Sequence, residues 1–413
     1  MNSLWVGNGQ YGVMDAAASG ERTAPLSSVT GCYFALRLFY VLIAVRIFGS
    51  TAQAGVTASL ACNYALLGLA LFALPTHRAQ PHLGATRLSR IVCAYLLLTG
   101  VSLLWSVTAS LAAATAFWGA MVADVAIVAL QLRGNTPDVV ARSLMGWFVR
   151  GASVIAVFAW LMPAQSDLRL GDEELLGPNQ IGWLCGFGFF FAQYLLLRKQ
   201  GGHWKVYAVL LGVTLLRCLS KTTIVAFLMA QLFILMRDRE ITRKTRRSLL
   251  ALALLVGIAF SSLLASYYAL YLNTGAGRQL ESLTGRLGIW TYILSEAVHR
   301  PWLGHGFHSV WKVIPMFYGV FEARHAHNEA LQQFYAYGVV GVILLFAIYI
   351  SLFQEIRKLR VHSLKIFWLG FLLFVLVRGL ADTEVFDISW PMWLILLFGA
   401  LARQSNDGTE TAS

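Results

Sequence analysis

The feature that most constrains this chain is a series of apolar runs, each about 20 residues long, that recurs along most of the sequence. A run of that length is what an α-helix needs to cross the hydrocarbon core of a bilayer. Because no water is present there, a spanning backbone must satisfy its own hydrogen bonds, as a helix or a closed barrel does. Barrel strands are shorter and alternate in polarity, which these runs do not. The sequence therefore predicts an all-α, polytopic transmembrane protein.

The composition excludes a soluble globular protein. Hydrophobic residues make up 58% of the chain and charged residues 13%, whereas soluble domains carry about 25% charge. The net charge of +12 would suit a nucleic-acid partner, but no basic stripe with interleaved aromatic residues stands out on a polar domain. We therefore assign the positive charge to cytoplasmic loops and expect no nucleic acid. The five cysteines lie in or beside apolar runs without a CxxC pair, as packing residues do.

The apolar runs predict about twelve transmembrane helices. Residues 1–30 are interpreted as a cytoplasmic polar tail, because no basic segment is followed by a short apolar core and a cleavage site. Helices one to nine fall within 31–271, helices ten to twelve within 331–402, and residues 403–413 form a second cytoplasmic tail. The connection at 272–330 is one large loop, of a length that is uncommon without a function. The predicted spans are 31–50, 54–75, 90–106, 109–132, 143–163, 179–197, 204–219, 222–236, 248–271, 331–353, 366–381 and 386–402.

Lysine and arginine in the connections set the orientation. Segment 237–247 holds six basic and two acidic residues, and segment 354–365 holds four basic residues and one acid. Further basic residues lie between spans two and three and between spans six and seven. All of these are even-numbered connections, so the positive-inside rule places them and both termini in the cytoplasm. The loop at 272–330 then faces the periplasm or exterior.

That loop carries an unusual concentration of polar side chains and a short helix of its own. Thr284-Gly285, followed by RLGIWTYILSEAVH and Pro301, has the pattern of a helix start, a helix and a stop. Arg286 lies where unpaired backbone N–H groups favour an anion, and its guanidinium suits a phosphate; snorkelling to lipid headgroups is the alternative. The polar residues of the loop are Arg278, Arg286, His299, Arg300, His305, His308, Arg324, His325, His327, Asn328 and Glu329.

Charged residues in or beside the spans extend the hypothesis of an anion site. Arg217 lies at the outer end of a span, with Lys221 four residues on, against the positive-inside trend. Charges at this depth usually face a cavity and have a function, although snorkelling is again the alternative. Arg37, Arg46 and Arg378 also lie in or near spans, where they could line the same cavity or pair with Asp382 or Glu384.

Several short motifs together resemble one family. They are TGRLGIW (284–290), RPWLGHGF (300–307) and HAHNEALQQFYAYGVVGVILLF (325–346), with weaker upstream matches in LLWS (103–106) and GPNQIG (177–182). In order and spacing they resemble the O-antigen ligase superfamily, which includes lipopolysaccharide O-antigen ligases, exopolysaccharide and O-antigen polymerases, and protein-glycosylating ligases. LSKTT at 219–223 departs from the pattern, because many relatives carry a serine–arginine pair there.

The resemblance implies a metal-independent glycosyltransferase that takes glycan from undecaprenyl-pyrophosphate at the periplasmic face of the bacterial inner membrane, without nucleotide sugar or cofactor. The family's essential loop arginine corresponds to Arg286, its loop histidine to His327, and an arginine near a helix end to Arg217. The arginines would neutralise the pyrophosphate leaving group, and His327 would accept the acceptor's proton in an inverting displacement. Asn328 would either orient the imidazole or cap the following helix. His325 and His327 stand two apart without a metal-site motif, so no metal is expected.

A secondary transporter or flippase of lipid-linked glycan is the alternative class, since it also has about twelve helices. A transporter places its polar residues near the bilayer midplane between paired halves, whereas here they gather in one exterior loop. Within the transferases, RPWLGHGF and LLWS favour an exopolysaccharide polymerase, and a ligase that joins glycan to lipid A-core is the next alternative. The expected acceptor is therefore a glycan or a lipid A-core.

The orientation can be tested with single cysteines and a membrane-impermeant label. We expect Val310→Cys to be labelled from outside and Thr242→Cys to be labelled only after the membrane is opened, because lysine and arginine mark the cytoplasmic side. External labelling of position 242 with none at position 310 would reject the orientation.

Overall fold

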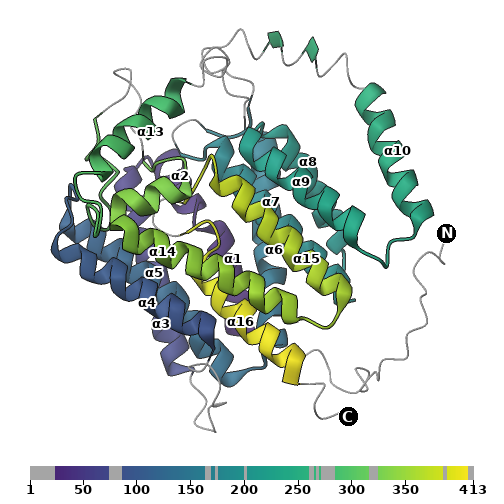
Figure 1. The fold of residues 1–413 in the computed structure, drawn as a ribbon, viewed down its shortest axis with the longest axis horizontal. Coiled ribbons are helices and arrows are strands. Elements are labelled where there is room, and N and C mark those ends of the chain that lie inside the picture. Colours follow the sequence, from purple (N-terminus) through teal and green to yellow (C-terminus); the bar gives the residue numbers. More distant parts are fainter. Residues whose placement is uncertain are drawn as a thin grey trace.

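The computed structural model describes residues 24–73, 86–162, 169–172, 175–199, 202–259, 265–266, 269–270, 284–315, 324–384 and 388–407. Within these ranges the chain is helical, with one isolated β-bridge between Asp172 and Leu176. Most helices pack side by side in a bundle, and α10 lies apart from it (Figure 1). The helices are α1 Pro25–Leu36, α2 Phe39–Arg46, α3 Ala52–Phe72, α4 Arg87–Val101, the 3₁₀ helix η2 Ser102–Leu104, α5 Leu111–Gly134, α6 Pro137–Leu161, α7 Pro178–Leu197, α8 Trp204–Arg217, α9 Lys221–Arg237, α10 Arg243–Ala259, α13 Thr284–Ala297, α14 Glu329–Lys358, α15 His362–Gly379 and α16 Met392–Asp407.

Local sequence signals explain where several helices begin. The hydroxyls of Thr51, Thr86 and Ser110 each accept a hydrogen bond from the backbone N–H three positions on, at 3.2, 3.1 and 3.3 Å. These bonds satisfy N–H groups that have no partner within the helix. Pro137 and Pro178 open α6 and α7 at the position where a missing N–H costs nothing.

The predicted all-α membrane fold is confirmed, and the predicted helix count is not. Each predicted span overlaps a helix, but only seven helices among the described residues are long and apolar enough to cross a bilayer, or eight if α1 and α2 form one bent span. The bend between α1 and α2 is 61°. α1 begins at Pro25, within the predicted tail, and α16 continues to Asp407. The second half of the span predicted at 248–271 lies largely outside the described residues.

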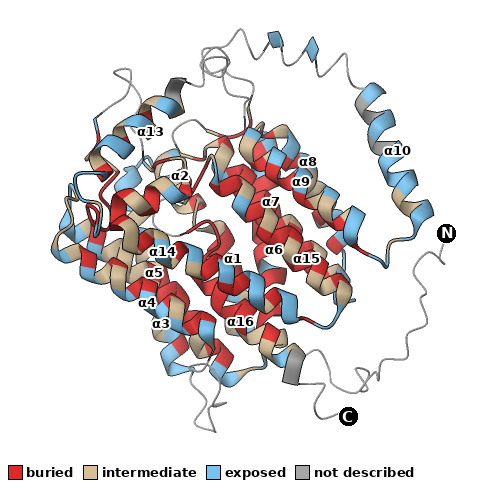
Figure 2. Cartoon of the chain, viewed as in Figure 1, coloured by how far each residue is buried: buried red, intermediate tan, exposed pale blue. Residues whose placement is uncertain are grey.

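Buried residues gather between the central helices, and exposed residues lie towards the outside of the bundle (Figure 2). In the most apolar stretch of α7, 72% of the residues are buried, whereas only 22% of the residues are buried in the corresponding stretch of α3 at the edge of the bundle. Phe190 of α7 and Phe371 of α15 meet with ring centroids 4.9 Å apart. Large apolar side chains such as Phe72, 91% exposed, point outward. An outer surface of this kind is stable only against lipid, so the chain is a membrane protein.

Segments predicted to be cytoplasmic meet at one end of the bundle. An imidazole nitrogen of His362, in the predicted loop 354–365, lies 3.2 Å from the carbonyl oxygen of Arg237, which begins the basic segment 237–247. Arg198 pairs with Asp138 at 2.9 Å, which joins two other even-numbered connections. Even-numbered connections therefore contact one another in pairs, as expected if they lie on the same side of the membrane.

A break in α14 joins the large loop to the bundle. The helix leaves helical geometry at Gly338, where φ is 63°. The N–H of Val339 donates to the carbonyl of Pro301 at 2.7 Å, and the N–H of Gly306 donates to the carbonyl of Ala336 at 2.8 Å. Residues 301–306 thus pair with backbone groups that the break leaves without helical partners.

We expect Gly338→Ala to destabilise the protein by about 1–3 kcal/mol, because alanine is strained at this φ. An added Cβ would also stand 2.3 Å from the carbonyl carbon of Trp302. The measurement is the thermal midpoint of unfolding in detergent.

Gly68→Ala is the matched control for this variant. Gly68 lies inside α3, and apart from its chain neighbours and the backbone of its own helix turns no atom lies within 4 Å of the place where its Cβ would stand. Alanine favours a helix over glycine, so the midpoint of this variant should hold or rise. Equal midpoints for the two variants would contradict the role given to the break.

Candidate functional site

Motifs that are far apart in the chain meet at the end of the bundle opposite the basic segments. LLWS contacts RPWLGHGF, because the indole N–H of Trp105 donates to the carbonyl of Leu303 at 3.2 Å. GPNQIG contacts LSKTT, because the hydroxyl of Ser220 donates to Oδ1 of Asn179 at 2.9 Å. The LSKTT segment, which departs from the family pattern, is therefore part of the same assembly of motifs.

Arg286 reaches from the loop helix α13 to the first turn of α9. Its guanidinium donates to Oγ1 of Thr222 at 3.2 Å. Burial lowers the pKa of Arg286, and the negative charge of Asp382 opposes that shift. A guanidinium stays protonated even so, and here it is partly withdrawn from water, which strengthens its attraction for an anion.

Helix α13 is fixed against the rest of the site by one of its faces. Ile289, Ile293 and Ala297 are buried beside Tyr335 of α14. The indole N–H of Trp290 donates to the carbonyl of Ala326 at 2.9 Å. The predicted helix is thus confirmed, and it is bonded to the segment that carries the two histidines.

His325 and His327 converge on Asp382, which follows α15. Nδ1 of His327 lies 3.3 Å from Oδ1 of Asp382, and Nε2 of His325 lies 3.9 Å from the same oxygen. The backbone N–H of His327 donates to Nδ1 of His325 at 3.2 Å, and the ring centroids are 4.1 Å apart. His327 has φ of 51°, a left-handed conformation that is costly for residues other than glycine and recurs at functional sites.

Asp382 is held ionised by its neighbours. Burial raises its pKa, but the Arg378 guanidinium and the hydrogen bond with His327 outweigh burial, and the pKa of Asp382 falls below its ordinary value. Arg378 lies 3.3 Å from Oδ2 of Asp382 and 2.8 Å from Oε1 of Glu384. Both carboxylates were among the predicted partners of Arg378. The approach of Asp382 to His327 was not predicted, because 55 residues separate the two and no motif joins them.

His325 is neutral at any physiological pH. Burial lowers its pKa to about 3, and the nearby guanidinium groups of Arg378 and Arg286 act in the same direction. A neutral imidazole has one N–H and one lone pair. Since Nδ1 of His325 accepts the backbone N–H of His327, its own proton lies on Nε2 and faces Asp382.

The same three side chains offer ligand atoms within 4.8 Å of one another, so a metal must be tested. Two histidines and an aspartate are a donor set that zinc accepts. His325 does not fit, because a metal on Nε2 would move its proton to Nδ1, which already faces the N–H of His327. Asp382 is also paired with Arg378. We therefore assign no metal role to these residues.

Asn328 caps α14, which was one of its two predicted roles. Its Oδ1 accepts the backbone N–H of Leu331 at 3.0 Å. Its Nδ2 donates to the carbonyl of Leu380 at 2.9 Å, which ties the start of α14 to the residues after α15. Asn328 thus fixes the relative position of His327 and Asp382 through the backbone.

The other predicted arginines are placed differently. Arg217 ends α8, and a turn in which Leu219 has φ of 55° leads from it into α9, close to Thr222. Arg37 pairs with Asp124 at 2.7 Å, and Arg46 pairs with Asp172. Neither pair was predicted, because both acids lie on elements far away in the sequence. Arg278 lies outside the described residues.

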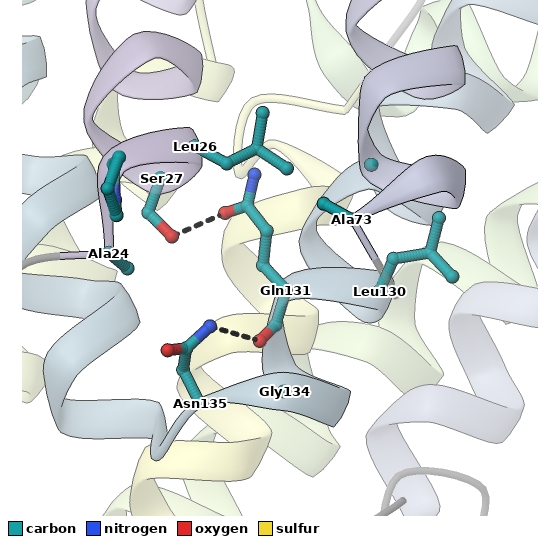
Figure 3. Close-up of a pocket in the computed structure, with 10 residues that line it drawn as sticks. Ala24, Leu26, Ser27, Ala73, Leu130, Gln131, Gly134 and Asn135 are labelled. Atoms are coloured by element: carbon teal, nitrogen blue, oxygen red, sulfur yellow. Dashed lines mark hydrogen bonds between the residues drawn. The ribbon is translucent and has the colours of Figure 1, made fainter. Parts of the chain in front are cut away.

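A pocket lies at the other end of the bundle and is no part of this site (Figure 3). Ser27, Gln131 and Asn135 lie on its wall, where Ser27 donates to Oε1 of Gln131 at 2.8 Å. Helix α5 begins beside the large loop and ends at this pocket, so the helix length separates the two places.

Comparison with known proteins confirms the resemblance seen in the motifs. Residues 206–346 match the family model described as O-antigen ligase. The matched range includes Arg217, Arg286 and His327, and it ends before Asp382. The chain is also 25% identical over 324 residues to the exopolysaccharide production protein ExoQ of Rhizobium meliloti (strain 1021). The aligned region covers 71% of this chain and 72% of that protein.

Protonation of His325 should make the protein less stable in acid. Its pKa is depressed from 6.5 to about 3, so the folded state binds fewer protons than the unfolded chain between these values. Acidification from about pH 7 to about pH 5 therefore lowers the free energy of unfolding, by up to ~2 kcal/mol from this group.

His325→Asn should reduce this fall, because Oδ1 of asparagine can accept the His327 N–H without titrating. The measurement is the difference in thermal midpoint between the two pH values, with exposed His203→Asn as the control. A fall that is unchanged in His325→Asn would show that His325 is not the group responsible.

Proposed function

We propose that this protein is a membrane glycosyltransferase that moves glycan from undecaprenyl-pyrophosphate to a hydroxyl of a cell-surface polysaccharide. The observation that carries the proposal is that a half-buried cation, Arg286, lies on a helix bonded to the segment that carries the imidazole of His327, at one end of a bundle of membrane helices. The match to the O-antigen ligase family and the similarity to ExoQ support a membrane glycan-processing enzyme.

The chemistry needs an anion site and a base. The hydroxyl oxygen of the acceptor attacks the anomeric carbon while the bond from that carbon to the pyrophosphate oxygen breaks. Arg286, with Arg217 near the start of α9, neutralises the charge that develops on the leaving pyrophosphate. His327 takes the hydroxyl proton and later releases it to water. Attack opposite the leaving group inverts the anomeric configuration, and the proposed reaction consumes no cofactor.

A lipid-linked donor explains why the site lies at the end of membrane helices. The pyrophosphate of such a donor is confined to the membrane boundary, and α13 presents exposed Leu287 and Leu294 beside its buried face. We place this boundary at the periplasmic face of a bacterial inner membrane, on the strength of the basic segments at the other end.

The structure also improves the cysteine-labelling test of orientation. Because Val310 is buried, exposed His299 is the better position for an external label.

The transporter alternative receives less support from this geometry. The polar residues lie in a loop and at helix ends, not between paired halves at mid-depth. Among transferases, the likeness to ExoQ favours an exopolysaccharide polymerase over a ligase. Deletion in the native host separates the two. Loss of long glycan with retained single units identifies a polymerase, and lipid-linked polymer that never reaches lipopolysaccharide identifies a ligase.

We expect Arg286→Ala to lower transfer by about 10²–10³-fold or more while the protein remains folded and inserted, because one charge-stabilising group is lost. Arg286→Lys should restore activity only in part, since a point charge lacks the planar fork of donors. Arg217→Ala should weaken transfer by less. The measurement is transfer in vitro with purified lipid-linked donor and acceptor, at matched protein levels.

Arg300→Ala is the control, because it removes an exposed arginine from the same loop. It should keep near wild-type activity. If Arg286→Ala transferred glycan as fast as wild type, the anion-site proposal would be wrong.

A further inference from the structure

We propose that Asp382 is a positioning residue that holds His327 in the one neutral form able to act as the base. In that form the proton is on Nδ1 and the lone pair is on Nε2. The inference rests on the proposed function, and it assigns a role to a residue that lies beyond the range matched by the family model.

The first step concerns hydrogen-bond direction. The Arg378 guanidinium lies 3.3 Å from Oδ2 of Asp382 and keeps this carboxylate ionised, and an ionised carboxylate can only accept hydrogen bonds. Nδ1 of His327, 3.3 Å from Oδ1, must therefore be the donor. A neutral imidazole carries a single N–H, so Nε2 of His327 holds the lone pair. The ring is thereby prepared to accept a proton at Nε2.

The second step explains why His325 is not an equivalent base. Its Nδ1 is occupied by the backbone N–H of His327, and its proton lies on Nε2 towards Asp382. The burial that lowers its pKa to about 3 makes it a weak proton acceptor. His325 instead braces the backbone of His327, which is held at φ of 51°.

The third step concerns rigidity. The side chain of Asp382 is 3% exposed and lies 3.3 Å from the Arg378 guanidinium, while Oδ1 also accepts the backbone N–H of Thr383 at 3.1 Å. Arg378 is held in turn by Glu384 at 2.8 Å. A carboxylate fixed in this way can stabilise the imidazolium that forms when His327 takes the proton. Asp382 is the carboxylate that contacts His327, and the guanidinium groups of Arg286 and Arg378 lie close enough to lower the pKa of the neighbouring His325.

Asp382→Asn is the decisive variant. An amide N–H₂ facing Nδ1 of His327 would donate to it and move the imidazole proton to Nε2, which removes the base. We expect kcat to fall by about 10²–10⁴-fold while KM for the lipid-linked donor changes little. Asp382→Glu, which keeps an accepting carboxylate, should recover part of kcat.

Glu384→Gln is the matched control for the ion pair. It removes the other carboxylate partner of Arg378 without touching either histidine. A fall in kcat that is as large for Glu384→Gln as for Asp382→Asn would show that only the ion pair with Arg378 matters, and would overturn the proposal.

A second readout does not depend on activity. In ¹⁵N-histidine spectra at about pH 8, where an ordinary imidazole is neutral, His327 should show a protonated Nδ1 in wild type and a protonated Nε2 in Asp382→Asn. Its signals are assigned by their loss in His327→Gln. The same tautomer in both proteins would overturn the proposal. Failure of wild type to transfer glycan would refute the proposed function, and the spectra would still report the tautomer.

Discussion

The fold depends on the absence of water in the bilayer, where each backbone polar group must find its partner within the protein. Most of the chain meets this requirement with unbroken helices. α14 does not, and the groups freed at Gly338 are paired by residues 301–306. The large loop is therefore held at a fixed height on the bundle by backbone bonds. Because α14 begins at the histidine segment, the same bonds also place His325 and His327.

A buried charge arrangement fixes the other side of the site. Arg378, at the end of α15, is neutralised by two carboxylates, and one of these faces His327. Burying a charge is costly unless it is paired, so loss of either partner leaves a penalty that the rest of the structure must absorb. Electrostatics and backbone pairing thus both contribute to the position of the imidazole. Arg286, for which we propose a role in anion binding, lies on α13, and Trp290 of the same helix bonds to the segment that carries the histidines.

Much of the fold could be predicted from the sequence, because the bilayer makes helix length and apolar content informative. Each predicted span overlaps a helix, and the helix at 284–297 was expected from its start and stop signals. The number of spans could not be settled in this way, since α8, α9 and α16 are short and α1 bends away from α2. Of the site, Arg286 and His327 came from motifs whose order is visible in one chain. Asp382 did not, because only tertiary packing shows which nitrogen of which histidine it meets. The same holds for Arg37, whose partner Asp124 lies on a distant helix.

The exchange of backbone bonds between 301–306 and 335–340 limits how this protein can be recombined. A loop grafted from a relative would bring its own spacing of carbonyls and N–H groups to a break that was shaped by the recipient's α14. Unless both segments are exchanged together, a chimera would leave buried backbone amides without hydrogen-bond partners. The loop and the first half of α14 therefore form one structural unit that must be exchanged together, although the sequence alone predicts a loop and a separate transmembrane helix.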